Sequence, residues 1–228
     1  RQLCNEYELL FKLEHPNIVK VYGFYLGDRK HNPAILLEYC KYNLEDAIKK
    51  KVTNADLVSF IFEICAAMKY VHKYKIIHRD LKMKNILITS KKHVKICDFG
   101  ISRSMELTTY TSRTIGIGTL PFMAPELFNQ KGKYNEKVDV YAFGVVMYFI
   151  LTKGEMPDFT GIGEYGNLRL PKSINKLSQS IIKKCWSKSP SERPSFKEIK
   201  NQIIENEFSL INGIEDEVQS ILDHLGLK

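Results

Sequence analysis

Three polar side chains near the middle of the chain have the chemistry that phosphoryl transfer requires. Asp80 and Asn85 lie in a short polar loop between two apolar runs, within the stretch IIHRDLKMKNILI at residues 76–88, and Asp98 comes ten residues later. A carboxylate at Asp80 can accept a proton from a hydroxyl group, and the oxygens of Asn85 and Asp98 can bind Mg²⁺. The spacing therefore predicts a magnesium-dependent phosphoryl-transfer site.

The motifs HRD at residues 78–80 and DFG at residues 98–100 resemble, in order and separation, the catalytic domain of the eukaryotic protein kinases. The resemblance extends from about Leu3 to about Ile204. It implies an α+β, protein-kinase-like fold with a mainly α-helical C-terminal lobe. Of the antiparallel β N-terminal lobe, only the helix that the family calls αC and its fourth and fifth strands would be present.

The resemblance also implies a division of the chain. The expected parts are a partial N-terminal lobe with the hinge (1–40), the C-terminal lobe (41–204) and a C-terminal extension (205–228).

Five residues are assigned to the transfer reaction by the resemblance. Asp80 would accept the proton of the acceptor hydroxyl, and Asn85 and Asp98 would hold two Mg²⁺ ions. Lys82 would reach the γ-phosphate of ATP as a point charge, and Thr119 would bridge Asp80 and Lys82. A lysine at position 82 is similar to the serine/threonine kinases, so the expected acceptors are Ser and Thr hydroxyls of protein substrates.

ATP is expected beside a predicted hairpin and the chain that follows it. Residues 18–26 and 34–38 are β-branched, aromatic and aliphatic, and the turn-rich segment GDRKHNP separates them. In the family, the backbone after the second strand binds adenine. The residues assigned to ATP by the resemblance are Leu37 as gatekeeper, Glu38, Tyr39 and Cys40 in the hinge, Asn43 at the ribose, Leu87 and Asp98.

Structural and regulatory roles come from the same resemblance. Those residues are Glu6, His78, Arg79, Phe99, Gly100, Glu126, Asp139 and Arg193. Glu6 matches the αC glutamate, with Glu8 as the solvent-facing alternative. Asp139 would bind the backbone of the catalytic loop, because a buried carboxylate needs hydrogen bonds. Glu126 ends GTLPFMAPE, and Arg193 lies in KCWSKSPSERPSF, which resembles tyrosine and tyrosine-kinase-like kinases; these two residues should form a largely buried ion pair.

Helices are predicted where apolar residues recur at helical spacing. The opening segment should form an amphipathic helix that ends near His15 and Pro16. Thr53 or Asn54 should cap a second helix. The predicted elements that remain are this second helix with Leu57, Ile61, Ile64, Met68 and Val71 on its buried face, short strands at 87–88 and 94–97, an apolar helix at 138–151, and a last helix with an acidic extension from Asn201 onward.

Residues 100–126 show no period and are rich in Ser, Thr and Gly, which predicts a long functional loop. The candidate phosphate acceptors are Ser102, Ser104, Thr108, Thr109, Thr111, Ser112 and Thr114. Arg79 is the cation that the family uses to bind such a phosphate, so an upstream activating kinase is an expected partner.

Composition favours a reduced, cytoplasmic protein without nucleic-acid or membrane partners. The five cysteines include no CxxC pair, which favours free thiols and no cysteine zinc site. The net charge of +8 comes from scattered lysines without interleaved aromatic residues, so a solvated surface is favoured over a nucleic-acid groove. The longest apolar run, 140–151, is too short to span a bilayer.

The sequence departs from the kinase pattern at two places. Residues 1–228 contain neither the glycine-rich loop nor the third-strand lysine of the family, and GIGEYGNLRLP at 161–171 stands where the family has a full helix. Two hypotheses follow, an ATP-dependent serine/threonine kinase and a non-catalytic, pseudokinase-like interaction module. The presence of Asp80, Asn85 and Asp98 favours the enzyme, although residues 1–228 alone are expected to bind MgATP poorly.

Overall fold

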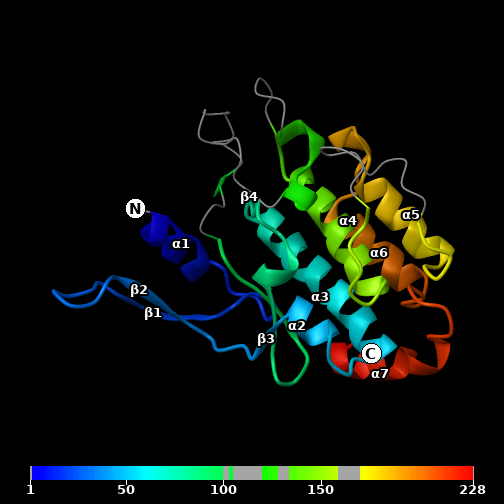
Figure 1. Cartoon of the computed structure of the whole chain (residues 1–228), viewed down its shortest axis with the longest axis horizontal. Helices are drawn as coiled ribbons and strands as arrows, with labels where there is room; N and C mark the ends of the chain where they lie inside the picture. The colour runs from blue at the N-terminus through cyan, green and yellow to red at the C-terminus, as the bar shows by residue number, and fades with distance from the viewer. Residues whose placement is uncertain (1, 100–102, 105–119, 128–133, 159–169, 228) are drawn as a thin grey trace.

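A computed structural model describes residues 2–99, 103–104, 120–127, 134–158 and 170–227, with the backbone alone for residues 2–6, 103–104 and 120. Figure 1 shows a helical body from one side of which a hairpin and the first helix project. Within the described residues, none of the helices combines the length and the apolar character needed to cross a membrane.

The projecting part contains α1 (Gln2–Phe11), β1 (Val21–Tyr25) and β2 (Ala34–Leu37). The two strands pair antiparallel, with Val21 opposite Leu37 and Tyr25 opposite Ala34, as the sequence predicts. Helix α1 ends at Phe11, earlier than expected. Pro16 disfavours a helical conformation at His15, and the His15 ring instead accepts a hydrogen bond from the Asn17 amide at 3.0 Å.

The segment between α1 and β1 is hydrogen-bonded to the helical body. The Ile96 amide donates to Asn17 O and the Val19 amide donates to Ile96 O, both at 2.9 Å. The Asn17 side chain also donates to Val94 O at 3.1 Å. These bonds fix the position of α1 and the hairpin relative to the strand that leads to Asp98.

Two long helices form the centre of the helical body, α3 (Asn54–Lys73) and α4 (Lys137–Leu151). Thr53 caps α3 in a reciprocal capping box with Asp56, and the apolar face predicted for this helix is fully buried. Nearly all of α4 is buried, which explains its continuous apolar sequence. The other helices are α2 (Leu44–Ile48), α5 (Lys176–Cys185), α6 (Phe196–Glu205) and α7 (Val218–Leu225).

Short antiparallel strands carry the chain into and out of the catalytic motifs. One sheet has the order β3-β5-β6, and a second pairs β4 with β7. The strands are β3 (Tyr42–Asn43), β4 (Ile76–Ile77), β5 (Ile86–Ile88), β6 (Val94–Ile96) and β7 (Arg103–Ser104). The short 3₁₀ turns are η1 (Met83–Asn85), η3 (Leu120–Phe122), η4 (Pro125–Leu127), η5 (Pro190–Glu192) and η6 (Glu215–Glu217). The sequence did not predict β7, which lies in the stretch expected to be a loop.

Residues after α6 pack against the helical body and end in α7, which lies beside α3 in Figure 1. Phe208, Leu210, Ile214 and Ile221 are all buried. Glu217 accepts a hydrogen bond from the Ala55 amide at 2.9 Å, so a carboxylate of this segment satisfies a free donor at the N-terminus of α3.

Candidate active site

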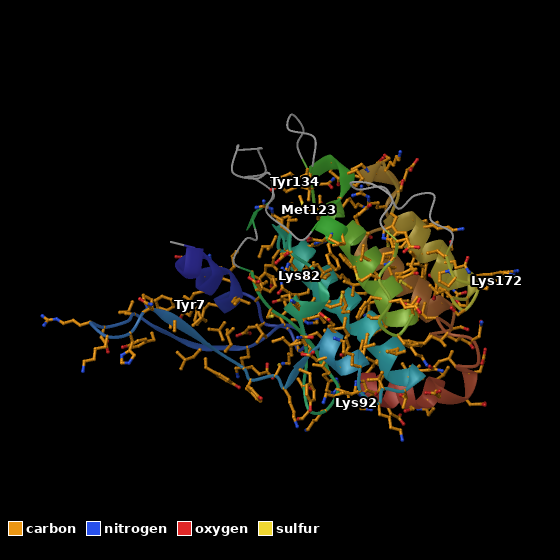
Figure 2. The ribbon with its side chains drawn as sticks, viewed as in Figure 1. Tyr7, Lys82, Lys92, Met123, Tyr134 and Lys172 are labelled. Carbon is orange, nitrogen blue, oxygen red and sulfur yellow. The ribbon has the colours of Figure 1, made fainter. Side chains whose placement is uncertain are left out.

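The polar loop between β4 and β5 holds three side chains in one hydrogen-bonded cluster. Lys82 Nζ donates to Asp80 Oδ2 at 2.6 Å. Asn85 Nδ2 donates to the same carboxylate at 2.9 Å and to Asp80 O at 2.8 Å. In Figure 2, Lys82 lies on the side of the helical body nearest α1. The lysine balances the charge of Asp80, and the amide of Asn85 fixes the orientation of the carboxylate.

Asp139, near the start of α4, holds this loop in place through hydrogen bonds to its backbone. Its Oδ1 accepts the Arg79 amide at 2.8 Å, and its Oδ2 accepts the His78 amide at 2.9 Å and His72 Nε2 at 2.8 Å. Arg79 has a φ of 71°, an unusual conformation that the two amide bonds hold in place. The predicted contact between Asp139 and the catalytic-loop backbone is present.

The charge of Asp139 is maintained although its side chain is only 1% exposed. Burial alone would raise the pKa of this carboxyl, but the hydrogen bond and charge of His72, with His78 and the Arg79 amide, lower the pKa below its ordinary value. His72 was not among the predicted residues. Its position in the last turn of the helix before HRD is the signal that could have found it.

Asp98 is positioned by the residues on either side of it. The Cys97 amide donates to Asn85 O at 3.0 Å, which brings the end of β6 beside the catalytic loop. His78 Nε2 donates to Cys97 O at 3.0 Å, and the His78 and Phe99 rings lie 4.7 Å apart. Phe99 is buried, whereas Asp98, with a φ of 62°, is exposed. The chain thus presents the Asp98 carboxylate outward while its neighbour packs inward.

The residues present fit a magnesium ion. Asn85 uses its amide nitrogen on Asp80, so its amide oxygen is the atom left to bind a cation, and Asp98 supplies a carboxylate. An oxygen-only donor set is the one that Mg²⁺ prefers. The backbone bond between Cys97 and Asn85 holds the two residues in neighbouring positions.

The residues predicted to contact ATP lie along the chain from β2 to α2 and on β5. Leu37 ends β2, and Leu87 pairs with Asn43 across the β3–β5 ladder. Glu38 forms an ion pair with Lys95 at 2.7 Å. Burial, with the charge of Glu38, raises the pKa of the Cys40 thiol. None of these contacts tests the binding of ATP, so the assignments of these residues to ATP stay predictions.

Asn43 has a structural role that the sequence did not predict. Its Oδ1 accepts the Asp46 amide at 2.9 Å, and its Nδ2 donates to the Asp46 carboxylate at 2.8 Å. The side chain therefore caps α2, as asparagine commonly does at a helix start. Its predicted contact with the ribose stays a prediction.

Glu126 and Arg193 form the predicted ion pair. Arg193 Nη1 and Nη2 donate to the two carboxylate oxygens at 2.7 and 2.8 Å. The Arg193 side chain is fully buried, and that of Glu126 is 16% exposed. The pair ties η4 to the residue that follows η5, shortly before α6 begins.

Several predicted positions lie outside the described residues. They are Gly100, Thr119, the side chain of Glu6, all the candidate phosphate acceptors except the backbone of Ser104, and residues 159–169 of the segment that departs from the kinase pattern.

Comparison with known proteins identifies close matches in sequence. Residues 1–203 match the family described as protein tyrosine and serine/threonine kinase. A probable serine/threonine-protein kinase of Dictyostelium discoideum is 35% identical over 201 residues, which cover 85% of this chain and 19% of that protein. Mitogen-activated protein kinase kinase kinase 12 of Rattus norvegicus is 37% identical over 202 residues, covering 83% of this chain and 22% of that protein.

A third relative is mitogen-activated protein kinase kinase kinase dlk-1 of Caenorhabditis briggsae, 36% identical over 208 residues, which cover 86% of this chain and 24% of that protein. The chain spans less than a quarter of the length of all three relatives. The kinase fold predicted from the HRD and DFG motifs is confirmed, with a mostly helical body and small antiparallel sheets. The chain belongs to the protein tyrosine and serine/threonine kinase family and is homologous to serine/threonine kinases.

Proposed function

We propose that this chain is the catalytic part of a serine/threonine kinase of the tyrosine-kinase-like type, which transfers the γ-phosphoryl group of ATP to Ser and Thr hydroxyls of protein substrates. The observation that carries the proposal is the cluster of Asp80, Lys82 and Asn85. The signature around Trp186 and Arg193 and the identity to serine/threonine kinases support the type.

Each member of the cluster has a chemical task in this reaction. Asp80 accepts the proton of the acceptor hydroxyl, and the Asn85 amide keeps the carboxylate turned toward that hydroxyl. Lys82, whose ammonium already lies at the cluster, supplies positive charge to the transferring phosphoryl group. The anchoring of the loop by Asp139 fixes these groups before substrate binds, which lowers the entropic part of the barrier.

Asn85 and Asp98 would hold Mg²⁺, which when bound neutralises charge on the phosphate oxygens of ATP. Leu37, Glu38, Cys40, Asn43 and Leu87 would form the adenosine side of the site, and Thr119 would contact Asp80 and Lys82. Glu6 would pair with the lysine that kinases carry on the third strand of the N-terminal lobe, a residue that positions 1–228 do not include.

We also propose that the activity is cytoplasmic and responds to an upstream kinase. Arg79 is 9% exposed, and its guanidinium lies over the Tyr134 ring at 5.5 Å. Arg79 precedes the catalytic carboxylate directly. A phosphate on residues 100–119 that bound Arg79 would therefore couple that segment to the cluster.

The test is a phosphotransfer assay with a library of Ser, Thr and Tyr peptides and the protein that carries residues 1–228. We expect Ser and Thr peptides to be labelled well above Tyr peptides. Lys82→Ala should lower the rate about a hundredfold or more, because the variant removes charge stabilisation at the phosphoryl group. Lys84→Ala is the matched control, since Lys84 lies two residues away and is exposed.

Three outcomes would count against the proposal. Predominant labelling of tyrosine would overturn the acceptor class. Equal losses in the Lys82 and Lys84 variants would remove the role of Lys82. Nucleotide binding without any transfer, in protein activated by an upstream kinase, would favour the interaction module.

A further inference from the structure

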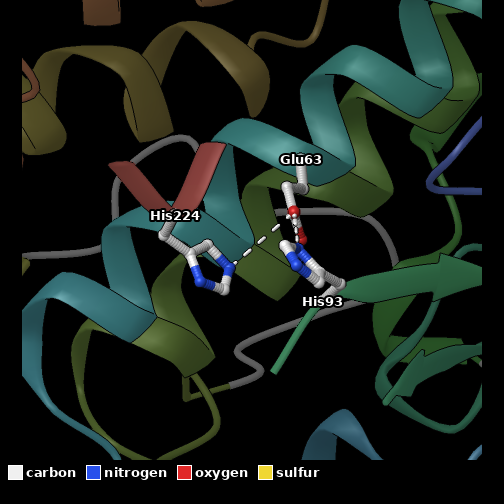
Figure 3. Close-up of side chains that lie close together, drawn as sticks. All are labelled: Glu63, His93 and His224. Carbon is white, nitrogen blue, oxygen red and sulfur yellow. Dashed lines mark hydrogen bonds and ion pairs between the residues drawn. The ribbon is translucent and has the colours of Figure 1, made fainter. Parts of the chain in front are cut away.

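A cluster of metal-binding side chains lies away from the catalytic loop, where the end of the chain packs on α3. Glu63 comes from α3, His93 from the turn before β6, and His224 from α7, and Figure 3 shows the three converging. They line a cavity of about 670 Å³. One ligand atom from each side chain lies within 4.8 Å of the other two.

The distances in this cluster are close to those of a four-coordinate zinc site. Glu63 Oε1 lies 2.7 Å from His93 Nδ1 and 3.9 Å from His224 Nε2. Bonds of about 2.0–2.2 Å in a tetrahedron place neighbouring ligand atoms about 3.3 Å apart. On metal binding, the distance from Glu63 Oε1 to His93 Nδ1 therefore has to lengthen, and the distance from Glu63 Oε1 to His224 Nε2 has to shorten, each by about 0.6 Å.

His224 carries the clearest indication of a ligand. Its Nε2 atom is buried, and within the described residues no group hydrogen-bonds it. In a neutral imidazole one ring nitrogen keeps a free lone pair, so a buried Nε2 without a hydrogen-bond partner can serve as a metal ligand.

Glu63 and His93 are fixed by the backbone around them. Glu63 Oε2 accepts the Val94 amide at 2.7 Å, which leaves Oε1 directed at the two histidines. The Thr89 hydroxyl accepts the His93 amide at 3.0 Å, and His93 O accepts the Thr89 amide at 2.9 Å. Lys92 within this tight turn has a φ of 63°. Two of the three side chains thus stand on a turn and a helix that are hydrogen-bonded to each other.

We propose that Glu63, His93 and His224 bind one Zn²⁺ ion, which fastens α7 to α3 and to the turn at residues 89–93. Two imidazoles and a carboxylate suit Zn²⁺, and three protein ligands leave the fourth position to a water molecule from the cavity. Metal binding at His93 Nδ1 displaces the proton that this atom shares with Glu63, and the neutral ring then carries its single proton on Nε2 after exchange with solvent. The ring stack of His93 and His224, 4.2 Å between centroids, opens as the two nitrogens turn toward the ion.

The experiment is a titration of the metal-free protein with Zn²⁺ by calorimetry and with Co²⁺ by visible absorption. We expect one tight site and the ligand-field bands of four-coordinate Co²⁺, without the intense thiolate band that cysteine ligands would give. His224→Gln and His93→Gln should each weaken binding by more than about a hundredfold, since even outer-shell partners of a metal are worth about 10- to 100-fold. His31→Gln is the matched control, because His31 is an exposed histidine that also contacts a carboxylate.

A second readout tests whether the ion fastens the helix. Zn²⁺ should slow proteolytic cleavage after residue 205 in the unchanged protein and leave cleavage of His224→Gln unaffected. The proposal fails if Zn²⁺ does not bind, if the His31 and His224 variants lose affinity equally, or if a thiolate band appears. It also fails if Zn²⁺ binds at the cluster without protecting α7.

Discussion

Arg193 Nη1 and Nη2 donate hydrogen bonds to the two carboxylate oxygens of Glu126, at 2.7 and 2.8 Å, although the two residues lie 67 positions apart in the sequence. The remaining donor Nε bonds Ser187 O at 2.9 Å, and Nη1 also bonds Lys137 O at 3.1 Å. The arginine thus has hydrogen-bond partners throughout its fork although it is fully buried, which is the condition under which a buried charge is tolerated.

Arg193→Ala should destabilise the protein by about 3–5 kcal/mol, because Glu126 would be left charged without its partner. The measurement is the free energy of unfolding from a denaturant titration. Arg29→Ala, at an exposed arginine, is the control and should change this free energy by less than about 0.5 kcal/mol. A loss below about 1 kcal/mol at Arg193 would show that the pair is solvated in solution.

Substitutions at Asp80 and Asp98 should differ in their effects on the rate of phosphotransfer and on nucleotide affinity. Asp80→Asn should lower the rate of phosphotransfer about a hundredfold or more and leave nucleotide affinity unchanged, because Asp80 acts on the acceptor hydroxyl. Asp98→Asn should lower both, since Asp98 binds the nucleotide through the metal. Asp216→Asn, in an exposed part of the C-terminal segment, is the isosteric control. Loss of affinity in Asp80→Asn with both properties retained in Asp98→Asn would reverse the assignment.

Asp139→Asn should destabilise the protein by about 1–3 kcal/mol, because an amide nitrogen would then face a buried N–H donor of His78 or Arg79. The pKa of Asp139 is lowered in the folded state, so the unfolded state binds more protons in acid. The stabilisation is therefore complete above the ordinary value of 3.8 and is lost as the pH falls through the lower folded value.

Urea titrations of both proteins from pH 7 downward test this dependence. The difference between the unchanged protein and Asp139→Asn should be constant at neutral pH and shrink only below the ordinary pKa of the carboxyl. A difference that already shrinks well above that pKa would show that these hydrogen bonds do not hold the carboxyl of Asp139 in its charged form.

Gly144 lies where α4 meets Trp186 with no room for a side chain. A Cβ there would lie 2.5 Å from Trp186 Nε1 and 2.9 Å from Cys185 Cβ. Gly→Ala within a helix normally stabilises by about 1 kcal/mol, but overpacking a core costs about 1–3 kcal/mol. We expect Gly144→Ala to lower the melting temperature, because overpacking outweighs the gain in helix propensity. The sign of the change in melting temperature therefore decides between the two effects.

Gly23→Ala is the control for this prediction, because a Cβ at Gly23 meets nothing within 4 Å. It should leave the melting temperature nearly unchanged. A rise in melting temperature for Gly144→Ala would show that Trp186 moves aside at little cost.

Local patterns in the sequence were enough to predict much of this structure. The cap of α3, predicted at Thr53 or Asn54, the apolar run of α4 and the HRD and DFG motifs are each contained in a few neighbouring residues. The Glu126 and Arg193 pair was predicted through the family resemblance, since nothing local connects two residues so far apart.

Contacts made by the fold alone could not be predicted. The cluster of Glu63, His93 and His224 joins segments whose sequences carry no shared motif. Strand β7 was missed because two residues show no period, and their partner strand β4 lies 26 residues earlier in the sequence, at Ile76–Ile77.

The hairpin of β1 and β2 should make a polypeptide of residues 1–228 self-associate. Tyr22 is 65% and Leu36 52% exposed on a sheet that has two strands within the described residues, and Leu26, which follows β1, is 80% exposed. A two-stranded sheet is marginally stable alone, and an exposed apolar edge invites pairing with another copy. We expect sedimentation velocity to show oligomers that increase with concentration.

Leu26→Lys combined with Leu36→Lys should return the polypeptide toward a monomer, whereas Asn32→Lys, which adds charge in the same hairpin at an exposed polar residue, should not. A monomer at all concentrations, or equal rescue by Asn32→Lys, would show that the apolar side chains of the hairpin do not drive association.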